Sequence, residues 1–180
     1  MKPMELTKTT INGEVVYRVW TDGGVIATFH DESQANNFVR RQMPYTINKK
    51  YHFYASHRNE TLSDKCYSLH GHNYQVTVGL QFEDLADNKK VTMLFSDIDS
   101  FIEPIIKELD HASIWNVQDP FYQDIKKHLI HYGMKTVEFD YPTSVENMCT
   151  YLFQRIESKG LPIRLITIQE TESSIVTYEK

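Results

Sequence analysis

Residues 66–80 read CYSLHGHNYQVTVGL, and from position 70 onward they alternate as a β-strand does. The even positions hold two histidines and then only tyrosine or aliphatic residues, whereas the odd positions hold glycine and polar residues. Because successive side chains of a strand point to opposite faces, we expect His70 and His72 on the apolar face, at the start of the strand.

Residues 51–57 have the same alternation, and His57 shares the side of the apolar residues. Three imidazoles from two neighbouring strands, without a fourth protein ligand, are typical of a catalytic zinc that keeps one position open. Gly71, between His70 and His72, leaves room for a close backbone approach. The pattern alone leaves a second interpretation open, in which the histidines are hydrogen-bonded core residues.

The remaining chain contains two predicted helices, over 98–109 and 145–156, with apolar residues at helical spacing. Thr143 and Glu146 have the spacing of a capping box for the second helix. A shorter helix is expected from Asp119 to Gly133, and a hairpin from strands over 163–170 and 175–178.

The N-terminal part predicts two strands, over 14–20 and 25–29, and a helix capped by Asp31 that ends near Arg41. Such a β-β-α unit is too small to build a core of its own. We therefore expect an N-terminal extension over residues 1–48 and a main domain over residues 49–180.

Composition excludes several classes of function. A formal net charge of -5 argues against a nucleic-acid-binding protein, because phosphate neutralisation needs clustered Lys and Arg. No apolar run approaches the roughly twenty residues of a membrane-spanning helix, and the N-terminus lacks the pattern of a secretory signal. We expect a cytoplasmic protein with no membrane partner, in which Cys66 and Cys149 are free thiols.

Five motifs, taken in order, resemble the 6-pyruvoyltetrahydropterin synthase superfamily and specifically its 6-carboxytetrahydropterin synthase branch. They are FYASHR at 53–58, CYSLHGHNY at 66–74, LDH at 109–111 with Asn116, PTS at 142–144 with Glu146-Asn147, and ET at 170–171. The resemblance covers about residues 51–178. The chain departs from the family pattern in its N-terminal addition and in a longer segment over 117–141.

The resemblance implies an α+β tunnelling fold, with a four-stranded antiparallel sheet backed by two helices. Three such sheets would close into a barrel, and two trimers would stack as a homohexamer. It further implies that zinc, bound by His57, His70 and His72, serves the conversion of 7,8-dihydroneopterin triphosphate. The products would be 6-carboxy-5,6,7,8-tetrahydropterin, acetaldehyde and triphosphate, as in queuosine and 7-deazaguanine biosynthesis.

The resemblance also implies roles for individual residues. Cys66 would be the general base, Asp110 and His111 would relay protons to an active site on an adjacent subunit, and Glu170 would anchor the pterin. Arg58 is a weaker candidate for contact with the triphosphate. The local sequence pattern alone indicates only an ordinary helix end at Asp110 and His111. It likewise indicates only a solvated carboxylate at the end of a strand for Glu170.

Two other functions compete with this one. The first is a 6-pyruvoyltetrahydropterin synthase, which eliminates triphosphate from the same substrate. Cys66 stands four residues before His70, a spacing that resembles the carboxy branch. The second is a non-catalytic pterin- or metal-binding module whose N-terminal unit recruits a partner. The joint presence of Cys66, Asp110, His111 and Glu170 favours an enzyme.

Overall fold

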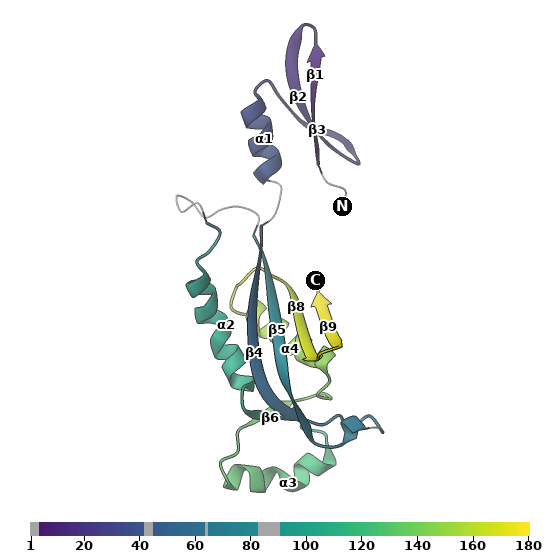
Figure 1. Cartoon of the computed structure of the whole chain (residues 1–180), viewed down its shortest axis with the longest axis vertical. Coiled ribbons are helices and arrows are strands. Elements are labelled where there is room, and N and C mark those ends of the chain that lie inside the picture. The colour runs from purple at the N-terminus through teal and green to yellow at the C-terminus, as the bar shows by residue number, and fades with distance from the viewer. Residues whose placement is uncertain (1–3, 42–44, 64, 83–90) are drawn as a thin grey trace. The chain divides into compact units, whose positions relative to one another are not determined.

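The computed structural model describes residues 4–41, 45–63, 65–82 and 91–180. The chain divides into two compact units, Met1–Tyr45 with Phe82–Thr92 and Thr46–Gln81 with Met93–Lys180 (Figure 1). Strand β4 (Tyr45–His57) begins before the predicted boundary between residues 48 and 49. The division into an extension and a main domain at that boundary stays a prediction.

The first unit is a three-stranded antiparallel sheet followed by a helix. It contains β1 (Glu5–Ile11), β2 (Glu14–Thr21), β3 (Gly24–Phe29) and α1 (Glu32–Arg41). The Asp31 carboxylate accepts a hydrogen bond of 2.8 Å from the Gln34 amide, so the predicted helix start is confirmed. Strand β1 was not predicted, and the unit therefore has one strand more than the expected β-β-α arrangement.

The second unit contains a six-stranded sheet in the order β7-β6-β4-β5-β8-β9. Besides β4, its strands are β5 (His70–Phe82), β6 (Ala112–Asn116), β7 (Thr136–Phe139), β8 (Ile163–Thr171) and β9 (Ser174–Glu179). The four predicted strands are present, and β8 pairs antiparallel with both β5 and β9. Two short additional strands extend the sheet, because β6 pairs parallel with both β4 and β7.

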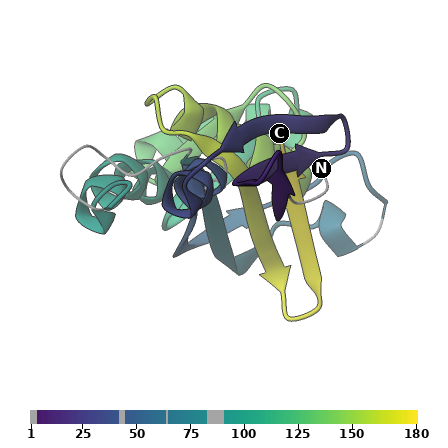
Figure 2. The same cartoon turned by 90° about the horizontal axis from the view of Figure 1, so that it is seen from above.

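Two long helices, α2 (Phe95–Leu109) and α4 (Val145–Glu157), pack against each other and build the core with the sheet. The buried core residues include Phe53, Tyr74, Val76, Ile98, Ile102, Leu109, Met148, Leu152 and Ile156. Figure 2 shows the β8–β9 hairpin extending away from the helices, with its turn at the far end. Within the described part of the chain, no helix combines the length and apolar character needed to cross a membrane.

The start of α4 corrects one prediction. Ser144, not Thr143, is the N-cap, and its hydroxyl accepts a hydrogen bond from the Asn147 amide. The Thr143 hydroxyl is instead fully buried and donates to the Arg58 carbonyl at 2.7 Å. Thr143 therefore joins the start of α4 to the residue that follows His57. A third helix, α3 (Pro120–His131), begins as predicted after Asp119, whose carboxylate accepts from the Phe121 amide.

A polar cluster joins β4 to α2 and yields a stability prediction. The Asp99 carboxylate accepts hydrogen bonds from Lys49 Nζ at 2.8 Å and from the Tyr51 hydroxyl at 2.7 Å. The hydrogen bond from Lys49 is the largest cause that lowers the pKa of Asp99, followed by that from Tyr51. A carboxylate with a lowered folded-state pKa stabilises the fold above its unfolded-state pKa, about 3.9, and loses this contribution as the pH falls through the folded-state value.

We expect Asp99→Asn to lower the melting temperature by a few degrees at pH 7. The difference from wild type should shrink below about pH 4, as the wild-type carboxylate becomes protonated. Thermal unfolding between pH 3 and pH 7 measures both effects, with Asp124→Asn, at an exposed position of α3, as the control. A melting-temperature difference that stays constant over this pH range would contradict the stabilising role of the ionised Asp99 carboxylate.

Candidate functional site

The structure brings the three predicted histidines together. His57 lies at the end of β4, and His70 and His72 lie at the start of β5. One potential ligand atom from each residue lies within 4.8 Å of the other two. His57 is 3 % exposed and the other two are partly buried. No other group of this kind occurs in the ranges that the structure describes.

Backbone carbonyls fix the orientation of two of these rings. His57 Nδ1 lies 2.7 Å from the Thr143 carbonyl oxygen, and His70 Nδ1 lies 2.7 Å from the Ser68 carbonyl oxygen. A carbonyl only accepts, so each Nδ1 carries the hydrogen and each Nε2 can present a lone pair. This support by hydrogen bonds is typical of imidazoles that ligate metals. Burial is the main cause that lowers the pKa of His72, which favours its neutral form.

Glu170, on β8, points its carboxylate at the same place. Its Oε1 lies 3.4 Å from His57 Nε2 and 3.5 Å from His72 Nε2. Contact with His57 is the largest cause that lowers the pKa of Glu170. His57 Nε2 is buried, and no described partner meets hydrogen-bond geometry there. A carboxylate oxygen facing ring lone pairs is repulsive unless a proton or a metal cation lies between them, and three imidazoles beside a carboxylate form a donor set that fits a divalent metal ion.

Tyr74 belongs to the site, although the sequence indicated only a core position. Its ring is fully buried, stacks on Phe53 at 4.8 Å between centroids, and meets the His72 ring edge-on at 5.5 Å. Burial first, and the Glu170 charge second, raise the pKa of Tyr74, so its hydroxyl remains a neutral donor. The signal that identifies Tyr74 is its shared parity with the histidines on β5.

Gly71 has the role expected for it. A Cβ at this position would lie 3.0 Å from the Ala55 carbonyl oxygen. Any larger residue would therefore press β5 away from β4, which carries His57. The close backbone approach keeps the ring of His57 near those of His70 and His72, with centroids 4.6 Å and 5.6 Å apart.

The two cysteines have different surroundings. Cys66 is partly buried in the 3-10 turn η1 (Lys65–Tyr67), and its carbonyl accepts a hydrogen bond of 2.8 Å from the Asn59 amide. Strand β5 begins at His70, three residues after this turn ends, so the turn leads directly into the strand that carries His70 and His72. Cys149 is fully buried on α4, where burial raises the pKa of its thiol to about 12.

Asp110 and His111 form a hydrogen-bonded pair directly after α2. His111 Nδ1 lies 2.9 Å from Asp110 Oδ2, and Asp110 Oδ1 accepts from the Tyr54 amide at 2.9 Å. That backbone hydrogen bond is the largest cause that lowers the pKa of Asp110. His111 has a φ of 57°, in the left-handed region that residues with a Cβ rarely adopt. Its amide donates to the Tyr54 carbonyl at 2.6 Å, which helps to hold this conformation.

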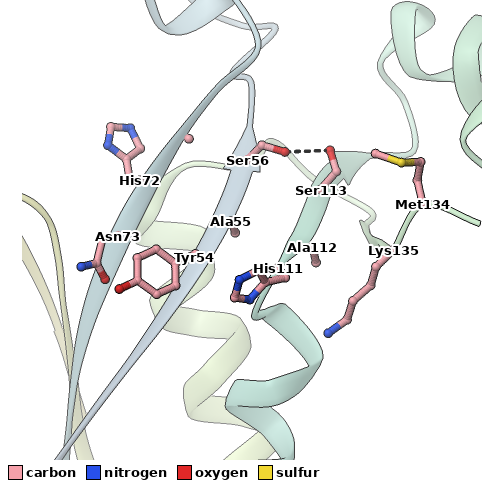
Figure 3. Close-up of a pocket in the computed structure, with 11 residues that line it drawn as sticks. Tyr54, Ala55, Ser56, His72, Asn73, His111, Ala112, Ser113, Met134 and Lys135 are labelled. Atoms are coloured by element: carbon pink, nitrogen blue, oxygen red, sulfur yellow. Dashed lines mark hydrogen bonds between the residues drawn. The ribbon is translucent and has the colours of Figure 1, made fainter.

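His111 lines a pocket of about 510 Å³ together with Tyr54, Ser56, His72, Asn73, Ser113 and Lys135 (Figure 3). Tyr54 and Ser56 alternate along β4 with the residues that face the metal-ligand side, so their side chains point to the opposite face. Figure 3 shows the His72 ring projecting away from His111. His72 also borders this pocket within one chain, whereas His57 and His70 do not. Delivery of the Asp110–His111 pair to an adjacent subunit stays a prediction.

Arg58 is packed inside the protein. Its side chain is 8 % exposed, and its Nε lies 3.3 Å from Asp119 Oδ2. The guanidinium carbon lies 4.3 Å from the centre of the Tyr67 ring and 5.0 Å from that of Phe121. Contact between Arg58 and the triphosphate stays a prediction, and the guanidinium group already has protein partners.

Comparison with known proteins identifies similar sequences. A family model described as 6-pyruvoyl tetrahydropterin synthase matches residues 46–180. The 6-carboxy-5,6,7,8-tetrahydropterin synthase of Aquifex aeolicus is 27% identical over 164 residues, covering 77% of this chain and 99% of its own. The enzyme of the same name from Haemophilus influenzae is 27% identical over 140 residues, covering 76% and 99%. The human 6-pyruvoyl tetrahydrobiopterin synthase is 25% identical over 155 residues, covering 77% and 94%.

Solved structures share the fold. An uncharacterized protein from Wolinella succinogenes aligns with a TM-score of 0.65 at 19% identity, covering 77% of this chain and 99% of its own. The 6-pyruvoyl tetrahydropterin synthase of Caenorhabditis elegans aligns with a TM-score of 0.57 at 22% identity, covering 78% and 98%. These alignments support the tunnelling fold that the motifs predicted.

Proposed function

Since the chain belongs to the 6-pyruvoyl tetrahydropterin synthase family, we propose that it is a 6-carboxytetrahydropterin synthase. It converts 7,8-dihydroneopterin triphosphate to 6-carboxy-5,6,7,8-tetrahydropterin, acetaldehyde and triphosphate. The observation that carries the proposal is the convergence of His57, His72 and Glu170 on one point, beside His70 and the Cys66 turn. The relatives from A. aeolicus and H. influenzae, matched over 99% of their length, bear this enzyme's name.

His57, His70 and His72 would hold the metal, for which three imidazoles favour zinc. When bound, zinc supplies a Lewis acid that lowers the pKa of substrate hydroxyl groups and eases removal of the neighbouring proton. The Cys66 thiolate accepts that proton as the general base. Glu170 accepts two N–H donors from the guanidine-like edge of the pterin, which orients the substrate beside the metal.

The Asp110–His111 pair serves as the proton relay. The carboxylate accepts from His111 Nδ1 and so leaves Nε2 to take or give a proton. Because His57 and His70 do not border the pocket that His111 lines, we propose that the pair completes the site of an adjacent subunit in a homohexamer. We also propose a cytoplasmic protein that acts in queuosine-type 7-deazaguanine synthesis.

Two alternatives remain as outcomes of the test. The similarity to the human 6-pyruvoyl tetrahydrobiopterin synthase favours triphosphate elimination without carbon–carbon cleavage as the second candidate. The spacing from Cys66 to His70 favours the carboxy reaction instead. The third candidate is a non-catalytic module that binds pterin or metal.

Product analysis separates these functions. The zinc-loaded protein is incubated with 7,8-dihydroneopterin triphosphate, and pterins and acetaldehyde are quantified by chromatography. We expect equal amounts of 6-carboxytetrahydropterin and acetaldehyde. A 6-pyruvoyl product without acetaldehyde would support the pyruvoyl reaction, and bound pterin without turnover would support the non-catalytic module. Asp124→Asn, at an exposed position of α3, is a control that should behave as wild type.

A further inference from the structure

Four residues from three parts of the chain surround a buried guanidinium group. This group, which we call the Arg58 cluster, consists of Arg58, Tyr67, Asp119 and Phe121. Arg58 lies between the rings of Tyr67 and Phe121, with its Nε 3.3 Å from the Asp119 carboxylate. The side chains of Arg58 and Asp119 are only 8 % and 2 % exposed. Burying such charges costs free energy unless they are paired, so the ion contact offsets part of that cost, although neither Arg58 Nε nor Asp119 Oδ2 meets hydrogen-bond geometry with a described residue.

Arg58 is anchored at both its backbone and its side chain. Its carbonyl accepts from the buried Thr143 hydroxyl at 2.7 Å. Asp119, which holds the guanidinium group, also caps α3 by accepting from the Phe121 amide at 3.0 Å. The cluster therefore rests on the first turn of α3, within the 117–141 segment that is longer than the family pattern.

The remaining member of the Arg58 cluster, Tyr67, lies in the turn that carries Cys66. Tyr67 is 51 % exposed, so burial in the core does not fix its position. Its ring is instead held at 4.3 Å from the guanidinium carbon of Arg58. Asn59, which follows Arg58 in the chain, donates its amide hydrogen to the Cys66 carbonyl at 2.8 Å. Residues 58 and 59 thus hold residues 66 and 67 by one side-chain contact and one backbone hydrogen bond.

We propose that Arg58 is a positioning residue that holds the Cys66 thiol in place through Tyr67, with α3 as its support. The proposal rests on the assignment of Cys66 as the base in the proposed function. It gives the start of the 117–141 segment a task in catalysis that acts through Arg58 and Tyr67. A guanidinium plane stacks on aromatic rings in a way that an ammonium group does not reproduce.

The test uses Arg58→Lys and Tyr67→Leu in the full-length, zinc-loaded protein. Tyr67→Phe keeps the aromatic face and should behave as wild type. Arg155→Lys is the matched control, because Arg155 also lies over a tyrosine ring and pairs with a glutamate, but on α4. The readouts are amide hydrogen exchange at Asn59, the rate of Cys66 alkylation by iodoacetamide, kcat and KM, and zinc content.

We expect exchange at Asn59 to be about fivefold or more faster in Arg58→Lys and Tyr67→Leu, as the loss of a cation–π contact implies. Alkylation of the partly buried Cys66 should accelerate, and kcat should fall while KM and zinc content change little. If Arg58→Lys proves unstable, Tyr67→Leu still gives a result, because its side chain is half exposed.

Two outcomes would overturn the proposal. A higher KM with wild-type kcat and wild-type exchange at Asn59 would make Arg58 a triphosphate ligand. Unchanged exchange and alkylation in both variants would show that the turn needs no such support. These two readouts need no substrate, so they separate a failure of this proposal from a failure of the proposed reaction.

Discussion

His72→Ala is expected to contain little zinc after dialysis, whereas the wild-type protein should carry about one zinc ion per chain. His72 contributes one of three ring nitrogens that lie within 4.8 Å of one another, and two imidazoles rarely hold a catalytic zinc alone. Elemental analysis of gel-filtered protein measures the loss. His128→Ala, at an exposed position on α3, is the control that should retain the metal.

Glu170 calls for a second variant in this experiment, because its carboxylate lies beside the ligand position of His72. Its Oε1 lies 3.5 Å from His72 Nε2, close enough to replace the missing ligand after a small movement. The double variant His72→Ala/Glu170→Gln should therefore lose any zinc that His72→Ala retains. Full occupancy in His57→Ala, His70→Ala and His72→Ala alike would refute the three-histidine site.

Cys66→Ala is expected to lose a factor of about a hundred or more in turnover, because it removes the proposed general base. Its zinc content and melting temperature should match wild type, since Cys66 is outside the ligand set and only partly buried. Cys149→Ala should show the reverse pattern, because Cys149 packs in the core of α4 and its removal leaves a small cavity. Steady-state kinetics and thermal unfolding of both variants measure the contrast.

Selective alkylation of the two thiols gives the result that would contradict their assigned roles. The raised pKa of the buried Cys149 thiol, about 12, should make it unreactive in the folded protein. If modification of Cys149 alone abolished turnover while Cys66 stayed unmodified, the roles assigned to the two thiols would be wrong.

The longer elements of the second unit were predictable because each has one buried face. The alternation over 70–80 matches β5, and the apolar spacing over 98–109 matches most of α2. Strand β6 escaped prediction because four of its five residues are buried, which removes the alternation. Strand β1 was missed although Asn12-Gly13, both at positive φ, forms the type of turn that joins two strands.

Local spacing alone predicts the histidines of the site, whereas Glu170 was predicted only through the family resemblance, because its position depends on strand pairing. His70 and His72 are neighbours on one strand, so their convergence follows from strand geometry alone. Glu170 reaches them because β8 pairs with β5 in a register that sets Gln169 opposite Gln75. That register depends on the whole sheet. The burial of Arg58 depends likewise on α3, which begins some sixty residues later in the chain.

His111 combines the side chain of the proposed relay with an unfavourable backbone conformation. At a φ of 57°, a residue with a Cβ is disfavoured by roughly 1 kcal/mol or more relative to glycine. Glycine at this position would relax the backbone and remove the imidazole that pairs with Asp110. A library selected only for heat resistance would therefore favour glycine at position 111 and enrich stable proteins without the proposed relay. Engineering of this enzyme for thermostability should keep position 111 fixed and seek its gains elsewhere in the chain.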